Sequence, residues 1–393
     1  HLYVKFNQLS FLLFASIYAL YGSTTISNIG VREIFLIILI VGSINFKLAI
    51  EFLKENLKSK TLIFFIFILI VGLIIAFINH NQFSKILRDL IFYGYIGYFF
   101  YLFYVIKKGH FNFNLILFFI FFVGVIFLLR SYYVSLTLHI DIKTLIIEKN
   151  YLIINISILF LASLFIILIS KDIKNYASNG FIFIIFPIIF LILYLYFTSK
   201  LTIRSSLVTF FGVFLYLFVL NVKKFFSKIK FKKSNYIIIL LPLIIIGIYI
   251  FFIQPNEIIF KMRNNFFNNR LSEFSSVQSA LNSNFDYIFG KGIGSLLLSK
   301  STNGYFNFVH NFFLHFYFKH GFLGFLFSIY FIYKIFMVLF KNILNLNLIT
   351  IAGFFPIIYG LMFSTSYKTL EFWMLLILMM YNKNKNIYDL KSI

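Results

Sequence analysis

Long runs of apolar residues recur along almost the whole chain, and they constrain its fold more than any other feature. A hydrocarbon core about 30 Å thick needs about 20 apolar residues per helix, and about twelve candidate spans of this kind can be marked. With 61% hydrophobic residues in 393 positions, the chain is too apolar for a soluble globular protein. The pattern predicts an all-α, polytopic membrane helix bundle, organised as a single integral membrane domain over residues 1–393.

The predicted spans have the following approximate bounds: Leu9–Tyr21, Ile34–Ile50, Thr61–Ile78, Leu90–Ile106, Phe111–Leu129, Tyr151–Ser170, Phe181–Phe197, Ser205–Val222, Tyr236–Ile253, Phe322–Phe340, Asn347–Phe363 and Phe372–Tyr381. The first and the last are short for a membrane crossing, so we expect between about ten and about twelve transmembrane helices. His1 in place of an initiator methionine suggests a trimmed or tag-derived start, and we expect no cleavable signal peptide.

The net charge of +23 does not by itself indicate a nucleic-acid partner. Lysines accumulate in the cytoplasmic loops of membrane proteins, and here they occupy alternate loops, with a dense run between Lys223 and Lys233. We therefore expect a lipid bilayer as partner, no nucleic acid, and both termini in the cytoplasm of a multi-pass protein. The long polar stretch at 254–321, between the ninth and tenth spans, then lies outside.

The arginines all fall on the outer side in this topology. They are Arg32, Arg88, Arg130, Arg204, Arg263 and Arg270. A guanidinium group binds phosphate bidentately, whereas lysine acts as a point charge. The placement of the arginines on one side indicates that the protein binds an anionic ligand at its outer face. Alternatively, the arginine side chains only extend to the membrane interface and bind no ligand.

The stretch 254–321 is expected to form one large external loop of short helices lying over the bundle and to carry most of the site. Gly290, Gly292, Gly294 and Gly304 should interrupt it. The glycines 290–294 are not a nucleotide-binding fingerprint, because no strand precedes them and the Lys-Ser/Thr pair is missing. Cysteine is absent, and we see no spacing of His, Asp and Glu that suggests a metal site, so we expect neither metal nor cofactor.

His310 is the candidate base at the end of this loop. At helical spacing one face carries His310, Leu314, Tyr317, Gly321 and Gly324, and the glycines would permit close helix approach. Asn307 is the predicted N-cap, which would place His310 in the first turn, where the helix dipole favours the neutral imidazole. The alternative is a structural role at the interface. His315 and His320 lie off this face and are weaker candidates.

Three motifs carry a resemblance to a known family. His310-Asn311 is followed by Leu314, Gly321 and Gly324 at the opening of a span; Thr202-Ile203-Arg204-Ser205-Ser206 precedes the eighth span; and Arg270 is followed by Ala280-Leu281 and by Gly290-Lys291-Gly292. In this order the motifs resemble the O-antigen polymerase and O-antigen ligase superfamily. Two positions depart from its pattern: Ile203 replaces a small residue, and the tryptophan and proline frequent in the loop are missing.

The resemblance implies a GT-C-like fold and a metal-independent glycosyltransferase in the bacterial inner membrane. It implies undecaprenyl-diphosphate-linked oligosaccharide as substrate, with Arg204 and Arg270 holding the diphosphate and His310 as general base. A chain-length regulator is a further expected partner. We expect further contacts with the substrate from Arg88, Arg263, Lys261, Asn311 and Tyr317. Arg88 could instead pair with Asp89. Glu273 is three residues after Arg270, and the two could form an ion pair on one helical face.

The leading hypothesis is therefore an O-antigen or related surface-polysaccharide polymerase. The ligase that transfers the polysaccharide to lipid A core is the first alternative. A flippase or other transporter of lipid-linked oligosaccharide is the second, and the lack of ionisable residues in the span centres argues against it, with Lys47 as the nearest exception.

Overall fold

The structure is a computed structural model, and it is mostly helical. It describes residues 2–21, 31–56, 59–137, 155–176, 182–201, 216, 272–298, 304–306, 309–345 and 347–381. The chain divides into two compact units, one made of residues 1–120, 265–338 and 360–393 and the other of residues 121–264 and 339–359. The first unit contains every described residue of the candidate site.

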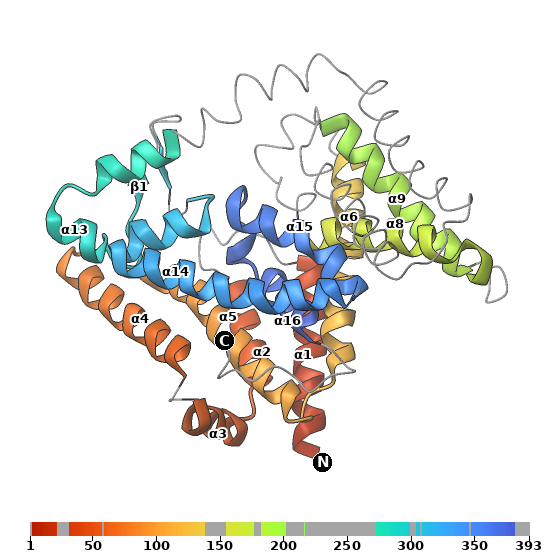
Figure 1. Cartoon of the computed structure of the whole chain (residues 1–393), viewed down its shortest axis with the longest axis horizontal. Coiled ribbons are helices and arrows are strands. Elements are labelled where there is room, and N and C mark those ends of the chain that lie inside the picture. Colours follow the sequence, from red (N-terminus) through yellow and green to blue (C-terminus); the bar gives the residue numbers. More distant parts are fainter. Residues whose placement is uncertain are drawn as a thin grey trace. The chain divides into compact units, whose positions relative to one another are not determined.

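The helices follow the apolar runs of the sequence (Figure 1). They are α1 (Leu2–Tyr21), α2 (Val31–Gly42), α3 (Phe46–Asn56), α4 (Lys60–Ile78), α5 (Phe83–Lys107), α6 (Phe113–Thr137), α8 (Ile156–Tyr176), α9 (Ile182–Leu201), α13 (Asn284–Phe289), α14 (Phe312–Leu344), α15 (Leu348–Met362) and α16 (Leu370–Met380). A 3-10 turn, η1 (Ser366–Lys368), precedes α16, and residues 272–280 are also helical. The strands β1 (Leu297–Leu298) and β2 (Tyr305–Phe306) form a small antiparallel hairpin.

Four helices of the described residues are long and apolar enough to cross a membrane, and a fifth crossing is added if α2 and α3 form one bent span. The four include α4, α5 and α14, which build the site, and the first 21 residues of α6. The predicted spans Ser205–Val222 and Tyr236–Ile253 lie outside the described residues, except for Tyr216 in the first. The chain is thus a helical membrane protein, and the count of twelve spans stays a prediction.

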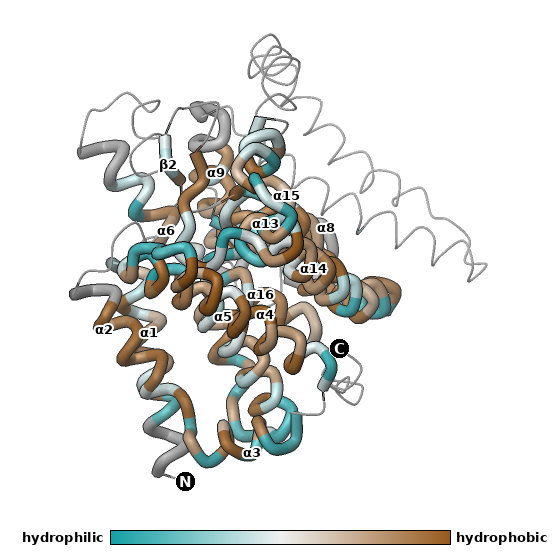
Figure 2. Tube along the Cα trace, turned by 90° about the vertical axis from the view of Figure 1, so that its left-hand side faces the viewer, coloured by the Kyte–Doolittle hydropathy of each residue, from teal (hydrophilic) through white to brown (hydrophobic). Residues whose placement is uncertain are grey.

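The helix α4 shows why such a sequence suits a bilayer. Ile63, Phe67, Ile70 and Ile74 recur every three or four residues and are about half exposed, whereas Phe65 on another face is buried. An exposed stripe of this size would be costly in water but is compatible with lipid, where the helix also satisfies its own backbone groups. Figure 2 shows the contrast with α3, a teal stretch among mostly brown helices.

The predicted span Ile34–Ile50 is not one straight helix, because α2 and α3 meet at an angle of 76°. The hydroxyl groups of Ser43 and Tyr98 lie 2.6 Å apart, and the backbone N–H of Asn45 donates to the Tyr101 hydroxyl at 2.8 Å. The Asn45 side chain also accepts from the N–H of Leu48 at the start of α3. Polar residues at the break therefore hold the bend against α5.

The core of the first unit is aromatic. Trp373 of α16, the single tryptophan of the chain, is fully buried and lies against Phe99 of α5 and Phe331 of α14, with ring centroids 5.6 and 6.1 Å away. Glu371, two residues before Trp373, is buried and accepts from the Tyr18 hydroxyl of α1 at 3.0 Å. These contacts bring α1, α5, α14 and α16 together.

The helix α14 is kinked at Gly321, whose φ of 60° and ψ of −153° are not helical. A first helical segment precedes the kink, and the second segment begins at Phe322, where the sequence analysis placed the start of the tenth span. In the second unit α8 lies against α9, and the rings of Phe165 and Phe190 are 5.2 Å apart.

Candidate functional site

The loop Gly290-Lys291-Gly292-Ile293-Gly294 enters the first unit instead of lying over it, contrary to the prediction. All three glycines have positive φ, which other residues rarely adopt. A Cβ atom at Gly290 would meet the α14 backbone near Lys319, one at Gly292 the α4 backbone, and one at Gly294 the α5 backbone, each within 2.8 Å. Glycine is therefore needed here both for the turn and for the approach of three helices.

The kink in α14 gives this loop its hydrogen-bond partners. The N–H groups of Lys291 and Gly292 donate to the carbonyls of Phe318 and Lys319 at 3.0 and 2.9 Å, just before Gly321. The N–H of Ile293 donates to the Gly72 carbonyl of α4 at 3.1 Å. The close approach predicted for Gly321 is confirmed, since a Cβ there would lie 2.3 Å from the backbone of Ile288.

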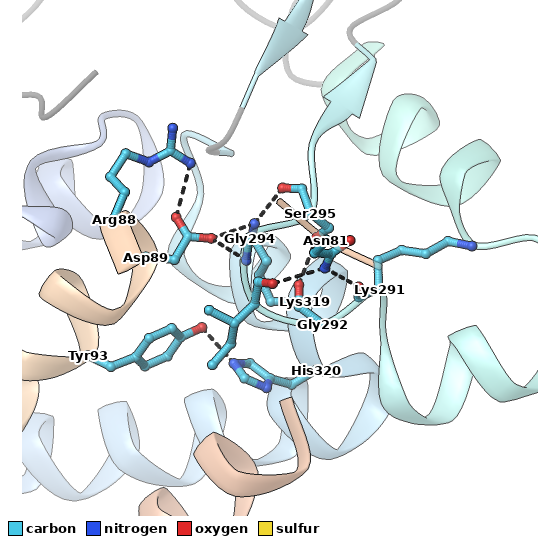
Figure 3. A network of polar contacts seen from close by, with 11 residues as sticks. Asn81, Arg88, Asp89, Tyr93, Lys291, Gly292, Gly294, Ser295, Lys319 and His320 are labelled. Carbon is cyan, nitrogen blue, oxygen red and sulfur yellow. Dashed lines mark hydrogen bonds and ion pairs between the residues drawn. The ribbon is translucent and has the colours of Figure 1, made fainter. Parts of the chain in front are cut away.

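Side chains fix the loop from both ends. The Asn81 amide donates to the carbonyls of Lys291 and Ile293 at 3.1 and 2.9 Å (Figure 3). At the other end Asp286 completes a capping box with Ser283 and accepts from Lys291 Nζ at 2.7 Å. Burial raises the pKa of Asp286, but the hydrogen bonds from Lys291 and Ser283 outweigh it and hold the pKa below its usual value.

Asp89 lies at the centre of a buried charge cluster, which we call the Asp89 cluster: Arg88, Asp89, Gly294, Ser295 and Lys319. The Asp89 carboxylate accepts from Lys319 Nζ at 2.7 Å, from the N–H of Gly294 at 2.9 Å and from Arg88 Nη2 at 3.3 Å. Lys319 also donates to the Ser295 carbonyl at 2.6 Å. Figure 3 shows that these groups come from α5, α14 and the glycine loop.

The exposed side-chain fractions of Lys319, Asp89 and Arg88 are 0, 3 and 6%. Two cations thus share one buried carboxylate, and Arg88 Nη1 has no hydrogen-bond partner among the described residues. Of the two roles expected for Arg88, the pairing with Asp89 is the one observed. The sequence analysis did not single out Lys319, although a charged residue inside an apolar run is a signal of a functional or paired position.

His320 and Tyr93 form a second polar contact beside the Asp89 cluster. The His320 Nε2 atom and the Tyr93 hydroxyl are 2.6 Å apart, and both residues are buried. Gly72 makes room for the imidazole, because a Cβ at this position would lie 2.4 Å from His320 Cε1. His315 is also fully buried, and neither of its ring nitrogens has a hydrogen-bond partner in the part of the chain that the structure describes.

Lys368, in η1, faces the same cluster, and sequence reasoning missed it. Its ammonium group lies 5.8 Å from the centre of the Phe92 ring. Burial lowers the pKa of Lys368 to about 7, with Asp89 acting in the opposite direction and Lys319 and Arg88 lowering it further. A lysine at this pKa is largely neutral above pH 7.

His310 lies before the helix and not in its first turn, contrary to the prediction. The helix α14 begins at Phe312, and Asn311 is the N-cap, because its side-chain oxygen accepts from the N–H groups of Phe313 and Leu314 at 3.0 and 3.1 Å. The predicted N-cap, Asn307, lies outside the described residues. His310 therefore does not share a helical face with Tyr317.

Glu273 is the partner of His310, which the sequence analysis did not predict. One carboxylate oxygen, Oε1, lies 3.0 Å from His310 Nδ1 and accepts from the His310 backbone N–H at 2.6 Å. The side chain of His310 is 34% exposed and that of Glu273 is 12% exposed. The pair is thus reachable from outside the protein, unlike the Asp89 cluster.

The remaining predicted site residues divide into two groups. Asn311 and Tyr317 have structural roles: Asn311 is the N-cap, and the half-buried ring of Tyr317 packs on Phe325 and on the cluster around Val277. Four predicted residues lie outside the described residues, namely Arg204, Lys261, Arg263 and Arg270.

Comparison of the chain with family models, with curated proteins and with solved structures gives no match. The function proposed below therefore depends on the sequence motifs and on the geometry of the site.

Proposed function

We propose that this chain is a glycosyltransferase that polymerises surface polysaccharide of the O-antigen type. It joins oligosaccharide repeat units carried on undecaprenyl diphosphate, at the periplasmic face of a bacterial inner membrane. The single observation that carries the proposal is the His310–Glu273 pair, because it gives the histidine of the motif the geometry of a general base.

The tautomer of His310 follows from its partner. An ionised carboxylate only accepts hydrogen bonds, so the neutral imidazole must carry its hydrogen on Nδ1, which lies 3.0 Å from Glu273. The lone pair is then on Nε2, which is the atom that takes up a proton. A carboxylate that orients the imidazole and stabilises its protonated form is the arrangement found in many enzymes that use histidine as a base.

The reaction requires these properties. The base removes the proton of an acceptor sugar hydroxyl as its oxygen attacks the anomeric carbon of the donor, a new C–O bond forms, and the bond to the diphosphate breaks. The electron pair leaves with the undecaprenyl diphosphate, whose developing charge needs cations nearby. Arg204 and Arg270, with Arg263 and Lys261 beside them in the sequence, are the proposed cations.

The distribution of charge in the first unit supports a site at the outer face. The Asp89 cluster lies near the beginning of α5, whereas Lys107 and Lys108 lie at its other end, where Lys108 pairs with Glu55 at 2.9 Å. The helix has 25 residues and is about 37 Å long, so the two groups lie at opposite ends of a bilayer-sized helix. We propose that Lys107 and Lys108 lie on the cytoplasmic side, as the positive-inside rule favours, and that the site lies on the periplasmic side.

The Asp89 cluster has a positioning role in this proposal. It connects α5 to the first segment of α14, which begins two residues after His310, and to the glycine loop. Because its charges are buried and paired, the cluster fixes the position of α14 and of His310 before it, without contacting the sugar.

A second candidate function is a flippase for the same lipid-linked substrate. The buried Asp89–Lys319 pair between two membrane helices favours it, because such pairs mark the pathways of many transporters. Asp89 lies near the beginning of α5 and Lys319 just before the kink of α14, so neither lies in the middle of a long apolar segment, which fits a transport pathway less well.

A reconstitution experiment tests the proposal. Purified protein in proteoliposomes receives undecaprenyl-diphosphate-linked repeat units, and products are separated by size and by sidedness. We expect polymer from the wild type and at least a hundredfold less from His310→Gln, since Gln can still donate to Glu273 but cannot take up a proton. The same substitution at the exposed His110 is the control. Translocation without a new glycosidic bond would show a flippase instead.

A deletion strain separates polymerase from ligase. Loss of a polymerase leaves lipid A core bearing a single repeat unit, whereas loss of a ligase leaves bare core. Bare core would show that the ligase assignment is correct.

A further inference from the structure

The helix α3 is a short, charged connection between two apolar helices. It has 11 residues and is about 16 Å long, which is about half of what is needed to cross a hydrocarbon core about 30 Å thick. Residues 34–42 of α2 and 61–78 of α4 contain no charged residue, whereas α3 contains four. We infer that α3 lies in the plane of the membrane interface and binds the head groups of anionic phospholipids. This inference goes beyond the proposed function and does not depend on it.

The bend before α3 sets its direction. Because α3 is inclined at 76° to α2, it runs close to the membrane plane when α2 crosses the bilayer. The bend is held from α5, where the hydroxyl groups of Tyr98 and Tyr101 contact Ser43 and the backbone of Asn45. The helix α5 is itself long enough to cross the membrane, so α3 is fixed against a membrane-spanning element.

An exposed apolar stripe runs along α3. It consists of Phe46, Ile50 and Leu53, which follow each other at helical spacing and have exposed fractions of 63, 54 and 44%. Another face of α3 is packed, with the buried ring of Phe52 5.5 Å from the ring of Tyr104 in α5. The stripe would be unfavourable in water, whereas acyl chains just below the head groups would cover it.

Charged residues lie on α3 beside this stripe. Lys47 and Lys54 are both exposed, and their spacing of seven residues places them on the same side of the helix. The described charged residues of α3 and of the ends of α4 and α5 next to it are Lys47, Glu51, Lys54, Glu55, Lys60, Lys107 and Lys108. Five lysines and two glutamates leave an excess of three positive charges, which complements an anionic head-group layer.

The combination of an apolar stripe with a basic face favours lipid over other partners. A nucleic acid would leave the stripe exposed to water, and a second copy of the chain would bring lysines of like charge together. Lipid already surrounds the apolar helices α2 and α4 that precede and follow α3. A zwitterionic head group has no net charge to balance the excess of lysines, so we assign the partner as anionic phospholipid.

Spin labelling measures where α3 lies. The chain has no cysteine, so one introduced cysteine is labelled selectively. Ile50→Cys and Glu51→Cys place the label on the stripe and on the charged face of the same turn. In nanodiscs, oxygen dissolved among the acyl chains should relax the first label more strongly, and a water-soluble nickel chelate the second.

Three results of this measurement would overturn the inference. A steady increase in depth from residue 46 to residue 55 would show that α3 continues the membrane crossing. Equal access of the nickel chelate to both labels would show that α3 lies in water. Spin–spin broadening at Ile50→Cys would show that a second copy of the chain covers the stripe.

Lipid competition measures the selectivity for head groups. The protein is purified from an equimolar mixture of phosphatidylglycerol and phosphatidylethanolamine, and the bound lipids are counted by native mass spectrometry. We expect the wild type to retain more of the anionic phosphatidylglycerol. Lys54→Gln should lower the ratio of the two lipids by about fivefold, the contribution of one lysine near a membrane surface, and adding Lys47→Gln should lower it further.

The matched control is Lys85→Gln, which removes the same charge near the beginning of α5 and should leave the ratio unchanged. Glu51→Gln removes a negative charge beside the lysines and should raise the ratio. The fluorescence of the buried Trp373 verifies that each variant is folded. Equal retention of both lipids by the wild type, or an equal change from Lys54→Gln and Lys85→Gln, would refute the selectivity for anionic lipid.

The two proposals fail separately, because neither measurement uses sugar transfer. A label depth or lipid ratio contrary to expectation would leave the proposed function standing. Loss of the proposed function, through absence of polymer, would leave the interfacial position and the lipid selectivity of α3 standing.

Discussion

The strongest prediction concerns the Asp89–Lys319 pair, which joins α5 to α14. At 2.7 Å and an effective dielectric constant of about 20, two unit charges attract each other by about 6 kcal/mol before the cost of removing them from water. Breaking a buried pair by removing one partner typically costs about 3 to 5 kcal/mol, because the other charge stays buried. Asp89→Asn should therefore destabilise the protein by about this amount.

Asparagine isolates the charge effect, because its side-chain oxygen can still accept from the N–H of Gly294. Lys319→Met should cost less than Asp89→Asn, since Arg88 remains beside the carboxylate. The double variant should be more stable than the sum of the single effects predicts, because it leaves no unpaired member of the Asp89–Lys319 pair.

The assay is denaturation in nanodiscs, followed by the fluorescence of Trp373. This is the only tryptophan in the chain, and it lies 6.4 Å from Phe92, one turn after Asp89, so its signal reports the unit that contains the pair. Ser43→Ala, which removes a buried hydroxyl contact elsewhere in the unit, is the control and should cost about 1 kcal/mol. Single-variant costs that add up in the double variant would refute the pairing.

Three further predictions follow from other parts of the site. Gly321→Ala should abolish accumulation of folded protein, because a Cβ would meet the Ile288 backbone at 2.3 Å. Size-exclusion chromatography measures this, and a normal yield of monodisperse protein would show that the kink tolerates a side chain. Glu273→Gln should lower polymerisation about tenfold to a hundredfold while the Trp373 unfolding midpoint stays unchanged. It should cause little further loss when His310 is already Gln, because the two residues act together, and the same loss in both backgrounds would contradict this. Lys368 should react with an amine-selective acylating reagent at pH 7.5 faster than the exposed Lys108, because burial lowers its pKa to about 7. The folded state holds this proton less tightly than the unfolded chain, so stability should rise with pH between about 7 and about 10, and Lys368→Met should flatten that rise; an unchanged slope would contradict it.

The helices could be predicted from the sequence because the apolar runs are long and dense. The runs that became α4, α5 and the second segment of α14 were placed within a few residues, except at the start of α5. The break between α2 and α3 was missed, since the apolar run continues through Ser43 and Asn45 and only the tyrosine hydroxyls of α5 show why it bends there.

The site was predicted in part. Glycine positions indicated interruptions and a close approach, and the loop and the kink confirm both. The partners of His310 and Asp89 could not be predicted, because Glu273 and Lys319 are separated from them by 37 and 230 residues, and a sequence pattern gives no information about such contacts. The helix start was placed too early because Asn307 and Asn311 offer the same capping chemistry.

The separation between Asp89 and its partners has a consequence for biosynthesis. Gly294 follows Asp89 by 205 residues and Lys319 by 230. At a synthesis rate of about 5 to 20 residues per second, α5 is complete for roughly 10 to 50 seconds before Lys319 leaves the ribosome. Throughout this interval Arg88, the residue before Asp89, is the counter-ion that α5 brings with it into the membrane. The adjacent arginine therefore lets an early helix carry a carboxylate until the late segment arrives.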